Sequence, residues 1–211
     1  MAGVEEVRGK QVVIRFEAGK CIHSRNCVLG HPEIFEPNVK GAWIHPDAAS
    51  VETVARVAHA CPSGAITYEV LGDGEAESLP TVNLMYVREN GPLAFNAPLV
   101  IDGDSVGFRA TLCRCGDSKT KPYCDGSHAG AGFLATGEPA AQDSESLAVR
   151  NGELEVTPVP DGPLQVMGAL EVVSGTGRTL NRVAKTFLCR CGASENKPYC
   201  DGSHKKINFK S

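Results

Sequence analysis

One pattern of 16 residues occurs twice in this sequence and constrains the possible folds of the chain more than any other feature. Residues 113–128 and residues 189–204 both read Cys-x-Cys-x8-Cys-x3-His, and each Cys and His of the second copy lies 76 positions after its counterpart. The matching side chains are Cys113, Cys115, Cys124, His128, Cys189, Cys191, Cys200 and His204. Three thiolates and one imidazole form a set that holds a metal ion or an iron–sulfur cluster. The repeat therefore predicts two equivalent metal-binding sites.

The spacing inside each copy indicates how the four side chains could be shared between two metal ions. Cys113 and Cys115 are close enough in sequence for their thiols to clasp one iron from a strand or a turn. Cys124 and His128 lie four residues apart, so on a helical turn they would share one face and hold a second iron. Asp125 is a good helix N-cap, so we expect a helix to begin there, with its N-terminal end facing an anionic cluster.

Both stretches resemble the CDGSH iron–sulfur domain, of which mitoNEET is a well-known member. The pattern of that family runs Cys-x-Cys-x2-Ser-x3-Pro-x-Cys-Asp-Gly-Ser-His, and each copy matches it at every fixed position. The resemblance implies that each copy binds one [2Fe-2S] cluster through its three cysteines and its histidine. The mitoNEET branch carries a membrane anchor, whereas no stretch of this chain approaches the roughly 18 apolar residues of a membrane span.

Two simpler interpretations of the cysteines compete with a cluster. A Cys3His set is also a common structural zinc site, and the spacing alone does not exclude it. A disulfide framework is disfavoured because the chain has 9 cysteines, an odd number. No secretion signal is visible either, and Cys-x-Cys thiols are too close to pair easily. Since the whole CDGSH motif is present, we favour the clusters over both alternatives.

A third candidate site involves Cys21, Cys27 and Cys61. The last of these begins a Cys-Pro-Ser-Gly-Ala-Ile run, which is similar to the run that follows the last ligand of bacterial-type ferredoxins. Such ferredoxins usually place Cys or Asp midway between the first two ligands, where this chain has Ser24. Three thiolates suit a [3Fe-4S] cluster, whereas a [4Fe-4S] cluster needs a fourth ligand from His23, Ser24 or solvent. We consider His23 a neighbour of the cluster rather than a ligand. The alternative is that these cysteines bind nothing.

The segment around these three cysteines has strand and helix signals. Residues 11–17 and 65–70 are rich in β-branched and aromatic side chains and predict two strands, and residues 42–46 predict a short one. Apolar residues at helical spacing predict a helix over 50–60, with Asp47 or Ser50 as its cap. We therefore expect an α+β ferredoxin-like domain at the N-terminus.

Short strands flank each copy of the repeated motif. Residues 99–101 and 108–112 bracket a turn in the first copy, and residues 170–173 and 183–188 do the same in the second. A few short strands cannot bury a core alone. Many CDGSH proteins dimerise through exchanged strands, so the resemblance implies that two small β-rich units form an intramolecular pseudo-dimer here. We expect a monomer with both clusters on one face.

An acidic, glycine-containing stretch at 71–80 predicts a linker. The expected domains are 1–75, divergent and ferredoxin-like; 76–140, the first CDGSH domain; and 141–211, the second.

Composition excludes several classes of function. A net charge of −4 gives no reason to expect binding to nucleic acid. The first residues lack the basic start and the apolar run of a signal peptide, and cysteines in ligand spacings indicate a reducing cytoplasm. We see no nucleophile–base pair and no phosphate-binding loop, so we expect no enzyme.

The motifs favour one function over two alternatives. Replacing a thiolate by imidazole should place the reduction potential between about −400 mV, typical of all-Cys clusters, and the range of Rieske centres. We therefore predict an electron carrier with two [2Fe-2S] clusters and a third cluster, serving a redox partner protein. The first alternative is storage of clusters and their transfer to an apo-acceptor. The second is a zinc-bound interaction module.

Overall fold

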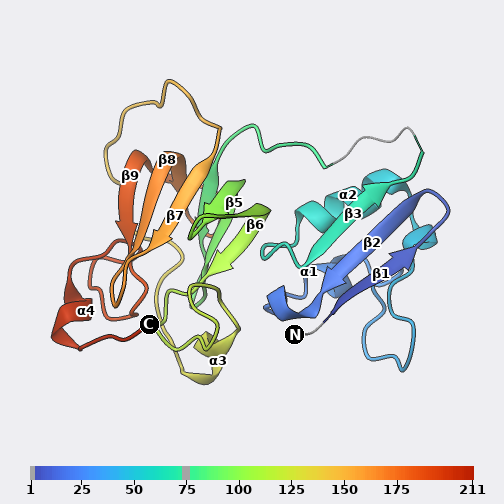
Figure 1. Cartoon of the computed structure of the whole chain (residues 1–211), viewed down its shortest axis with the longest axis horizontal. Coiled ribbons are helices and arrows are strands. Elements are labelled where there is room, and N and C mark those ends of the chain that lie inside the picture. Colours follow the sequence, from blue (N-terminus) through green and yellow to red (C-terminus); the bar gives the residue numbers. More distant parts are fainter. Residues whose placement is uncertain (1–2, 73–76) are drawn as a thin grey trace. The chain divides into compact units, whose positions relative to one another are not determined.

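A computed structural model describes residues 3–72 and 77–211 and divides the chain into two compact units, 1–78 and 79–211. The two units are mostly β, and their helices are few and short (Figure 1). Both copies of the repeated motif belong to the second unit. Residues 73–76 of the expected linker lie outside the described residues, as does part of the expected boundary after residue 75. The division between the two CDGSH domains stays a prediction.

The first unit is built on a three-stranded antiparallel sheet. Its strands are β1 (Val4–Arg8), β2 (Val12–Glu17) and β3 (Ile66–Val70), in the order β1-β2-β3. The positions of β2 and β3 agree with the predicted strands. We did not predict β1, because its residues are nearly all exposed and show little apolar patterning. It forms as the edge of a hairpin in which Gly9 N donates to Val12 O at 2.9 Å.

The helices of the first unit are short. They are η1 (Ala18–Lys20), α1 (Asn26–Gly30), η2 (Pro46–Ala48) and α2 (Val51–His59). Helix α2 confirms the predicted helix, and Ser50 is its N-cap because its hydroxyl accepts a hydrogen bond from Thr53 N at 3.3 Å. The strand expected at 42–46 is reduced to one isolated bridge between Ile44 and Phe35. The ferredoxin-like α+β arrangement of this unit stays a prediction.

The second unit contains six strands and two helices of four residues each. The first repeat supplies β4 (Leu84–Val87), β5 (Leu93–Ile101), β6 (Asp104–Leu112) and α3 (Ser127–Gly130). The second repeat supplies β7 (Leu154–Pro158), β8 (Leu164–Val173), β9 (Thr179–Leu188) and α4 (Ser203–Lys206). The long hairpins β5–β6 and β8–β9 occupy the positions of the predicted strand pairs and extend them.

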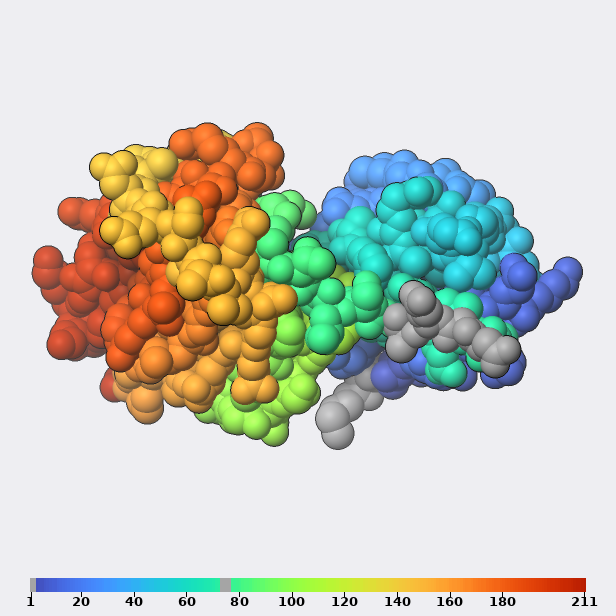
Figure 2. Space-filling view, turned by 90° about the horizontal axis from the view of Figure 1, so that it is seen from above, coloured from blue at the N-terminus to red at the C-terminus, as the bar shows by residue number. Residues whose placement is uncertain are grey.

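The strands of the two repeats pair with one another in a reciprocal way. Strand β4 is antiparallel to β5 of its own repeat and parallel to β8 of the other. In the same manner, β7 is antiparallel to β8 and parallel to β5. Met85 therefore lies opposite Val172, and Val156 lies opposite Ile101. In the space-filling view the two repeats adjoin as one continuous body (Figure 2).

A single hydrophobic core lies under this shared sheet. Met85, Leu93 and Leu112 of the first repeat are fully buried together with Leu164 and Leu188 of the second. Since both repeats contribute fully buried side chains to this core, the core depends on both.

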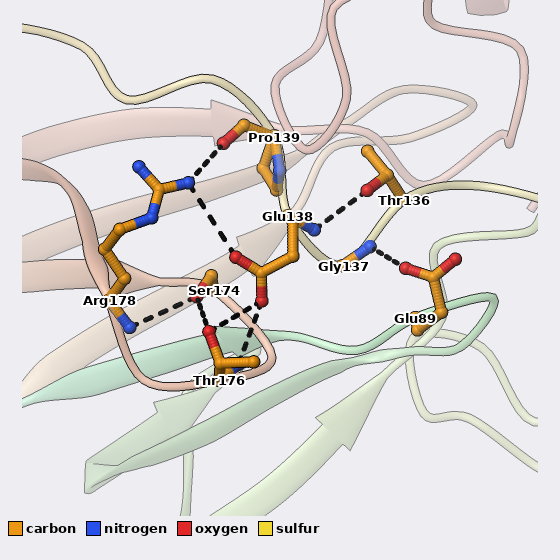
Figure 3. A network of polar contacts seen from close by, with 8 residues as sticks. All are labelled: Glu89, Thr136, Gly137, Glu138, Pro139, Ser174, Thr176 and Arg178. Atoms are coloured by element: carbon orange, nitrogen blue, oxygen red, sulfur yellow. Dashed lines mark hydrogen bonds and ion pairs between the residues drawn. The ribbon is translucent and has the colours of Figure 1, made fainter.

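The segment that follows the first motif is tied to the β8–β9 hairpin of the second repeat (Figure 3). The carboxylate of Glu138 accepts hydrogen bonds from Thr176 N at 3.0 Å and from Thr176 Oγ1 at 2.9 Å, and it lies 3.7 Å from the guanidinium of Arg178. On the other side of this segment, Gly137 N donates to the carboxylate of Glu89. These contacts hold the connection between the repeats beside the shared sheet.

Candidate metal centres

The first repeated motif brings its four predicted ligands together as two pairs. The Sγ atoms of Cys113 and Cys115 lie 3.7 Å apart, directly after β6. The Sγ atom of Cys124 lies 3.3 Å from Nδ1 of His128. Both Cys113 and Cys115 are buried, whereas His128 is half-buried.

The second motif has the same geometry. Sγ of Cys189 lies 3.9 Å from Sγ of Cys191, and Sγ of Cys200 lies 3.4 Å from Nδ1 of His204. The agreement between the copies is expected, because their loops have the same length and the same fixed residues.

The pairing bears on what each site can hold. Across residues 3–72 and 77–211, no three Cys, His, Asp or Glu side chains are close enough together to hold a single metal ion. A zinc ion takes all four ligands at once in a tetrahedron. Two separate pairs of donors fit a two-iron cluster better, because each iron takes one pair.

The loop between the second and third cysteines is closed by hydrogen bonds of its own side chains. The hydroxyl of Ser118 donates to Tyr123 O at 2.6 Å, and Lys121 Nζ donates to Ser118 O at 2.7 Å. Ser194 and Lys197 make the same two contacts in the second copy. The lysine before the proline in each copy therefore stabilises the conformation of its own loop.

The expected helix begins later than Asp125. It starts at Ser127, with Gly126 as its N-cap in the left-handed region (φ 86°) and without a side-chain cap. Cys124 thus precedes the helix, and the idea that it shares a helical face with His128 is wrong. Instead, Gly126 N donates to the Cys124 sulfur at 3.4 Å, which a residue with positive φ permits. The carboxylate of Asp125 accepts hydrogen bonds from the backbone instead of capping the helix.

Those hydrogen bonds keep the Asp125 carboxylate charged. Its partial burial alone would raise its pKa, but the N–H groups of Lys119 and Ser127, at 2.8 and 2.9 Å, outweigh burial and bring the pKa to about 2. In the second copy, the N–H groups of Glu195 and Ser203 hold the pKa of Asp201 well below its usual range. The aspartate therefore braces both ends of the loop that carries the ligands.

The thiols show how burial affects metal binding. Burial raises the pKa of Cys124 to about 11 and lowers the pKa of His128, so both groups favour their neutral forms. The hydrogen bond between Cys113 and Cys115 lowers the pKa of Cys113 and raises that of Cys115, so Cys113 is the first of the two to lose its proton. A metal that binds here must displace protons from buried thiols.

The three N-terminal cysteines line one cavity of about 610 Å³. Cys21 precedes α1, Cys27 lies within it, and Cys61 follows α2. The side-chain amide of Asn26 donates to Ala60 O at 3.0 Å and so holds α1 against the end of α2. Burial raises the pKa of Cys21 and of Cys27, and the charge of Cys61 raises both further. Three thiols around one hollow fit a cluster.

His23 and Ser24 also line this cavity. His23 lies in the left-handed region with φ 54°, and its backbone N–H donates to the sulfur of Cys21 at 3.4 Å. It is exposed. The backbone after Cys21 therefore supplies one hydrogen-bond donor to its sulfur, a contact of the kind that supports a metal ligand.

Sequence reasoning missed four residues that shape the paired sites. Arg114 and Arg190, between the first two cysteines of each motif, are 1% and 3% exposed. Gly116 and Gly192 allow the two motifs to touch, because Cys115 and Cys191 form an isolated antiparallel bridge. The sequence Cys-Arg-Cys-Gly occurs in both copies of the motif, and this identity could have indicated that the arginine and the glycine matter.

Comparison with known proteins supports an iron–sulfur cofactor. Residues 7–70 match the family described as "Divergent 4Fe-4S mono-cluster", and residues 90–129 and 161–205 match the one described as "Iron-binding zinc finger CDGSH type". The described sites and these matches define an iron–sulfur protein. Specifically, the chain belongs to the CDGSH iron–sulfur family, and a divergent iron–sulfur segment precedes its two CDGSH segments.

Each of three individual relatives matches part of the chain. "Uncharacterized protein YjdI" of Escherichia coli (strain K12) is 42% identical over 60 residues, which are 28% of this chain and 78% of the relative. "CDGSH iron-sulfur domain-containing protein 1" of Rattus norvegicus is 33% identical over 81 residues, which are 37% of this chain and 71% of the relative. "CDGSH iron-sulfur domain protein" of Drosophila melanogaster is 40% identical over 43 residues, which are 20% of this chain and 30% of the relative.

Two further observations concern the whole chain. In the portion that the structure describes, no helix has the length and apolar character needed to cross a membrane. All 9 cysteines are free thiols.

Proposed function

We propose that this protein carries electrons on two [2Fe-2S] clusters, each held by three cysteines and one histidine, and on a third cluster held by Cys21, Cys27 and Cys61. One observation carries the proposal: each CDGSH motif presents its four donors as two close pairs, with distances of 3.3 to 3.9 Å, in two loops that touch one another. The side chains of Ser118, Lys121 and Asp125 hydrogen-bond within the loop itself, so we propose a carrier and not an enzyme.

The role of the protein residues in this function is to hold and shield the clusters. The bound clusters would supply one-electron chemistry. The cysteines and histidines position the iron, the Asp125 and Asp201 carboxylates brace the loops, and the buried sheet beneath limits access of water. Because an imidazole replaces one thiolate, we expect reduction potentials above the roughly −400 mV of all-Cys clusters.

We further propose that the two repeats act as an intramolecular pseudo-dimer, with the chain as a monomer. The reciprocal pairing of β4 with β8 and of β7 with β5 supports this. The third cluster is [3Fe-4S], or [4Fe-4S] with a non-cysteine ligand. A redox partner protein and a reducing cytoplasm complete the proposal, and the free thiols support the latter.

A second function has support from the histidines. The side chains of His128 and His204 are half-buried and not fully enclosed, so protonation of a ligand imidazole would release a ligand and with it the cluster. The protein would then store clusters and transfer them to an apo-acceptor protein.

Electron paramagnetic resonance tests the first proposal. Anaerobically purified protein should be red-brown, contain iron and sulfide, and show two [2Fe-2S] signals after reduction together with a separate signal from the third cluster. Protein that contains zinc and no sulfide would refute the proposal. Incubation with an apo-ferredoxin then separates the two functions: cluster loss to the acceptor at neutral pH favours transfer, and stable redox cycling favours the carrier.

A further inference from the structure

The two CDGSH motifs meet at their second cysteines. Cys115 and Cys191 lie opposite each other in an isolated antiparallel bridge. A Cβ atom added to Gly116 would lie 2.7 Å from the Cys191 carbonyl oxygen, and one added to Gly192 would lie closer still to the Cys115 carbonyl oxygen. The two glycines therefore permit a backbone contact that places the two candidate clusters next to each other.

A buried arginine stands beside this contact in the first copy. The guanidinium of Arg114 donates only to backbone carbonyls: Gly91 at 3.0 Å, Thr136 at 3.2 Å, Arg88 at 2.6 Å and Ala135 at 3.3 Å. The side chain is 1% exposed. These contacts orient the cation but do not neutralise its charge.

Its counterpart in the second copy is placed in the same way. The guanidinium of Arg190 donates to Gly162 O at 3.0 Å and to Val159 O at 2.6 Å. It stacks over the ring of Phe209 at 5.6 Å, and Lys121 of the first copy approaches that ring at 5.8 Å. The ring of Phe209 thus contacts a cation from each copy.

Neither arginine forms an ion pair with a carboxylate among the residues that the structure describes. The carboxylates of Glu89 and Asp161 act on Arg114 and Arg190 respectively, but from beyond ion-pair distance. A buried charge without a counter-charge in contact with it is costly. An oxidised [2Fe-2S] cluster held by three thiolates and one neutral imidazole has a net negative charge, and reduction adds one electron. The clusters are therefore suitable counter-charges for the arginines.

The contact between the motifs brings each arginine close to the opposite site. Arg114 is the chain neighbour of Cys115, which lies opposite Cys191, a predicted ligand of the second site. Arg190 is the chain neighbour of Cys191, which lies opposite Cys115, a predicted ligand of the first site. Each buried cation therefore lies one residue from the backbone contact with the opposite site.

We propose that Arg114 and Arg190 are positioning residues that tune both clusters, each making the cluster of the opposite copy easier to reduce. The inference rests on the proposed function, because it requires clusters in both sites. In the reduction, one electron passes from an electrode to one cluster, one ferric ion becomes ferrous, and no bond forms or breaks. The arginine favours the product because the product has one more negative charge.

The test needs one cluster to be observed alone. The substitution His204→Cys adds a thiolate to the second site and lowers its potential, so the first cluster is reduced separately. In this background, Arg190→Gln removes a positive charge from the second motif. The potential of the first cluster is then measured in a redox titration that is monitored by electron paramagnetic resonance. We expect the equilibrium constant for reduction of the first cluster to fall about tenfold, a shift of about 59 mV for a one-electron couple. Arg114→Gln in a His128→Cys background should have the same effect on the second cluster.

Two controls identify the cause. Arg190→Lys keeps the positive charge and should leave the first cluster within about twofold of its reference value. Lys119→Gln removes an exposed charge from the first motif, and it should leave the second cluster unchanged because water screens the charge.

Iron and sulfide analysis of every variant separates the possible failures. Absence of clusters from the unsubstituted protein refutes the proposed function. Clusters that are present but whose potentials do not respond to the opposite arginine refute only this inference. If Arg190→Gln empties the first site, Arg190→Lys decides: retention of the first cluster supports the role of charge, and equal loss overturns it.

Discussion

At the scale of single residues, the surroundings of each side chain in the paired sites determine whether its neutral or its charged form is favoured. Burial favours the neutral form of Cys124 and of His128, whereas backbone N–H groups lower the pKa of Asp125 and favour its charged form. A metal must therefore supply the free energy that deprotonates the thiols. Occupancy should accordingly depend on pH.

The histidines should determine the acid sensitivity of the paired clusters. The His128 pKa lies below its ordinary value because burial disfavours the charged ring, so the neutral ring stabilises the fold above that ordinary value. That stabilisation is lost as pH falls through the lowered pKa, and protonation also removes a donor from iron. We expect the double substitution His128→Cys and His204→Cys to slow the loss of visible absorbance at pH 5.5 at least tenfold. Equal rates of loss would contradict this account.

The contact between the motifs should be intolerant of any side chain. Gly116 has φ +93° and faces the Cys191 carbonyl, whereas Gly103 has φ +87° and has nothing within 4 Å of an added Cβ. We expect Gly103→Ala to cost about 1–2 kcal/mol for its left-handed conformation. Gly116→Ala should cost about 1–3 kcal/mol more because of overpacking. Urea unfolding measures both, and equal costs would mean that the motifs do not touch.

At the scale of elements, the second unit depends on strands that pair across the repeats. Strand β4 pairs with β5 of its own repeat and with β8 of the other repeat, so its buried side chains pack in a core that both repeats share. The connection after the first motif is held by Glu138 against the β8–β9 hairpin (Figure 3). A substitution that destabilises β4 should therefore destabilise both CDGSH sites.

Truncation of Met85 in β4 tests this dependence. Met85 is fully buried, whereas Met167 in β8 is 36% exposed and offers a matched control. We expect Met85→Ala to lower the free energy of unfolding by about 2–5 kcal/mol and Met167→Ala to lower it by under about 1 kcal/mol. Both paired clusters should be lost in one transition in the Met85 variant. Loss of one cluster while the other remains would argue against a shared core.

At the scale of the whole molecule, two units with separate cores hold separate sites. The cavity around Cys21, Cys27 and Cys61 is lined by residues of the first unit alone, and the CDGSH motifs lie in the second unit alone. Any electron transfer between the sites would therefore link units that fold around different cores.

Substitution of one N-terminal cysteine should affect one unit only. Cys61→Ser removes a thiol that lines the cavity, and we expect it to abolish the signal of the third cluster in electron paramagnetic resonance. The two [2Fe-2S] signals and the unfolding of the second unit should stay unchanged. Ser63→Ala, beside Cys61 at 3.8 Å, is the control and should retain all signals. Loss of the [2Fe-2S] signals in the Cys61 variant would show that the units depend on each other.

The sequence by itself determined the features that depend on short-range spacing. The pairs of Cys and His donors lie within loops of fixed length, and helix α2 has a serine cap and an apolar face, so both could be predicted from neighbouring residues. The tertiary structure alone decided the pairing of β4 with β8, the burial of Arg114 and Arg190, and the meeting of Gly116 with Cys191. It also decided the edge strand β1, whose exposed residues have no apolar pattern. These features arise from contacts between residues far apart in the chain, which no local pattern encodes.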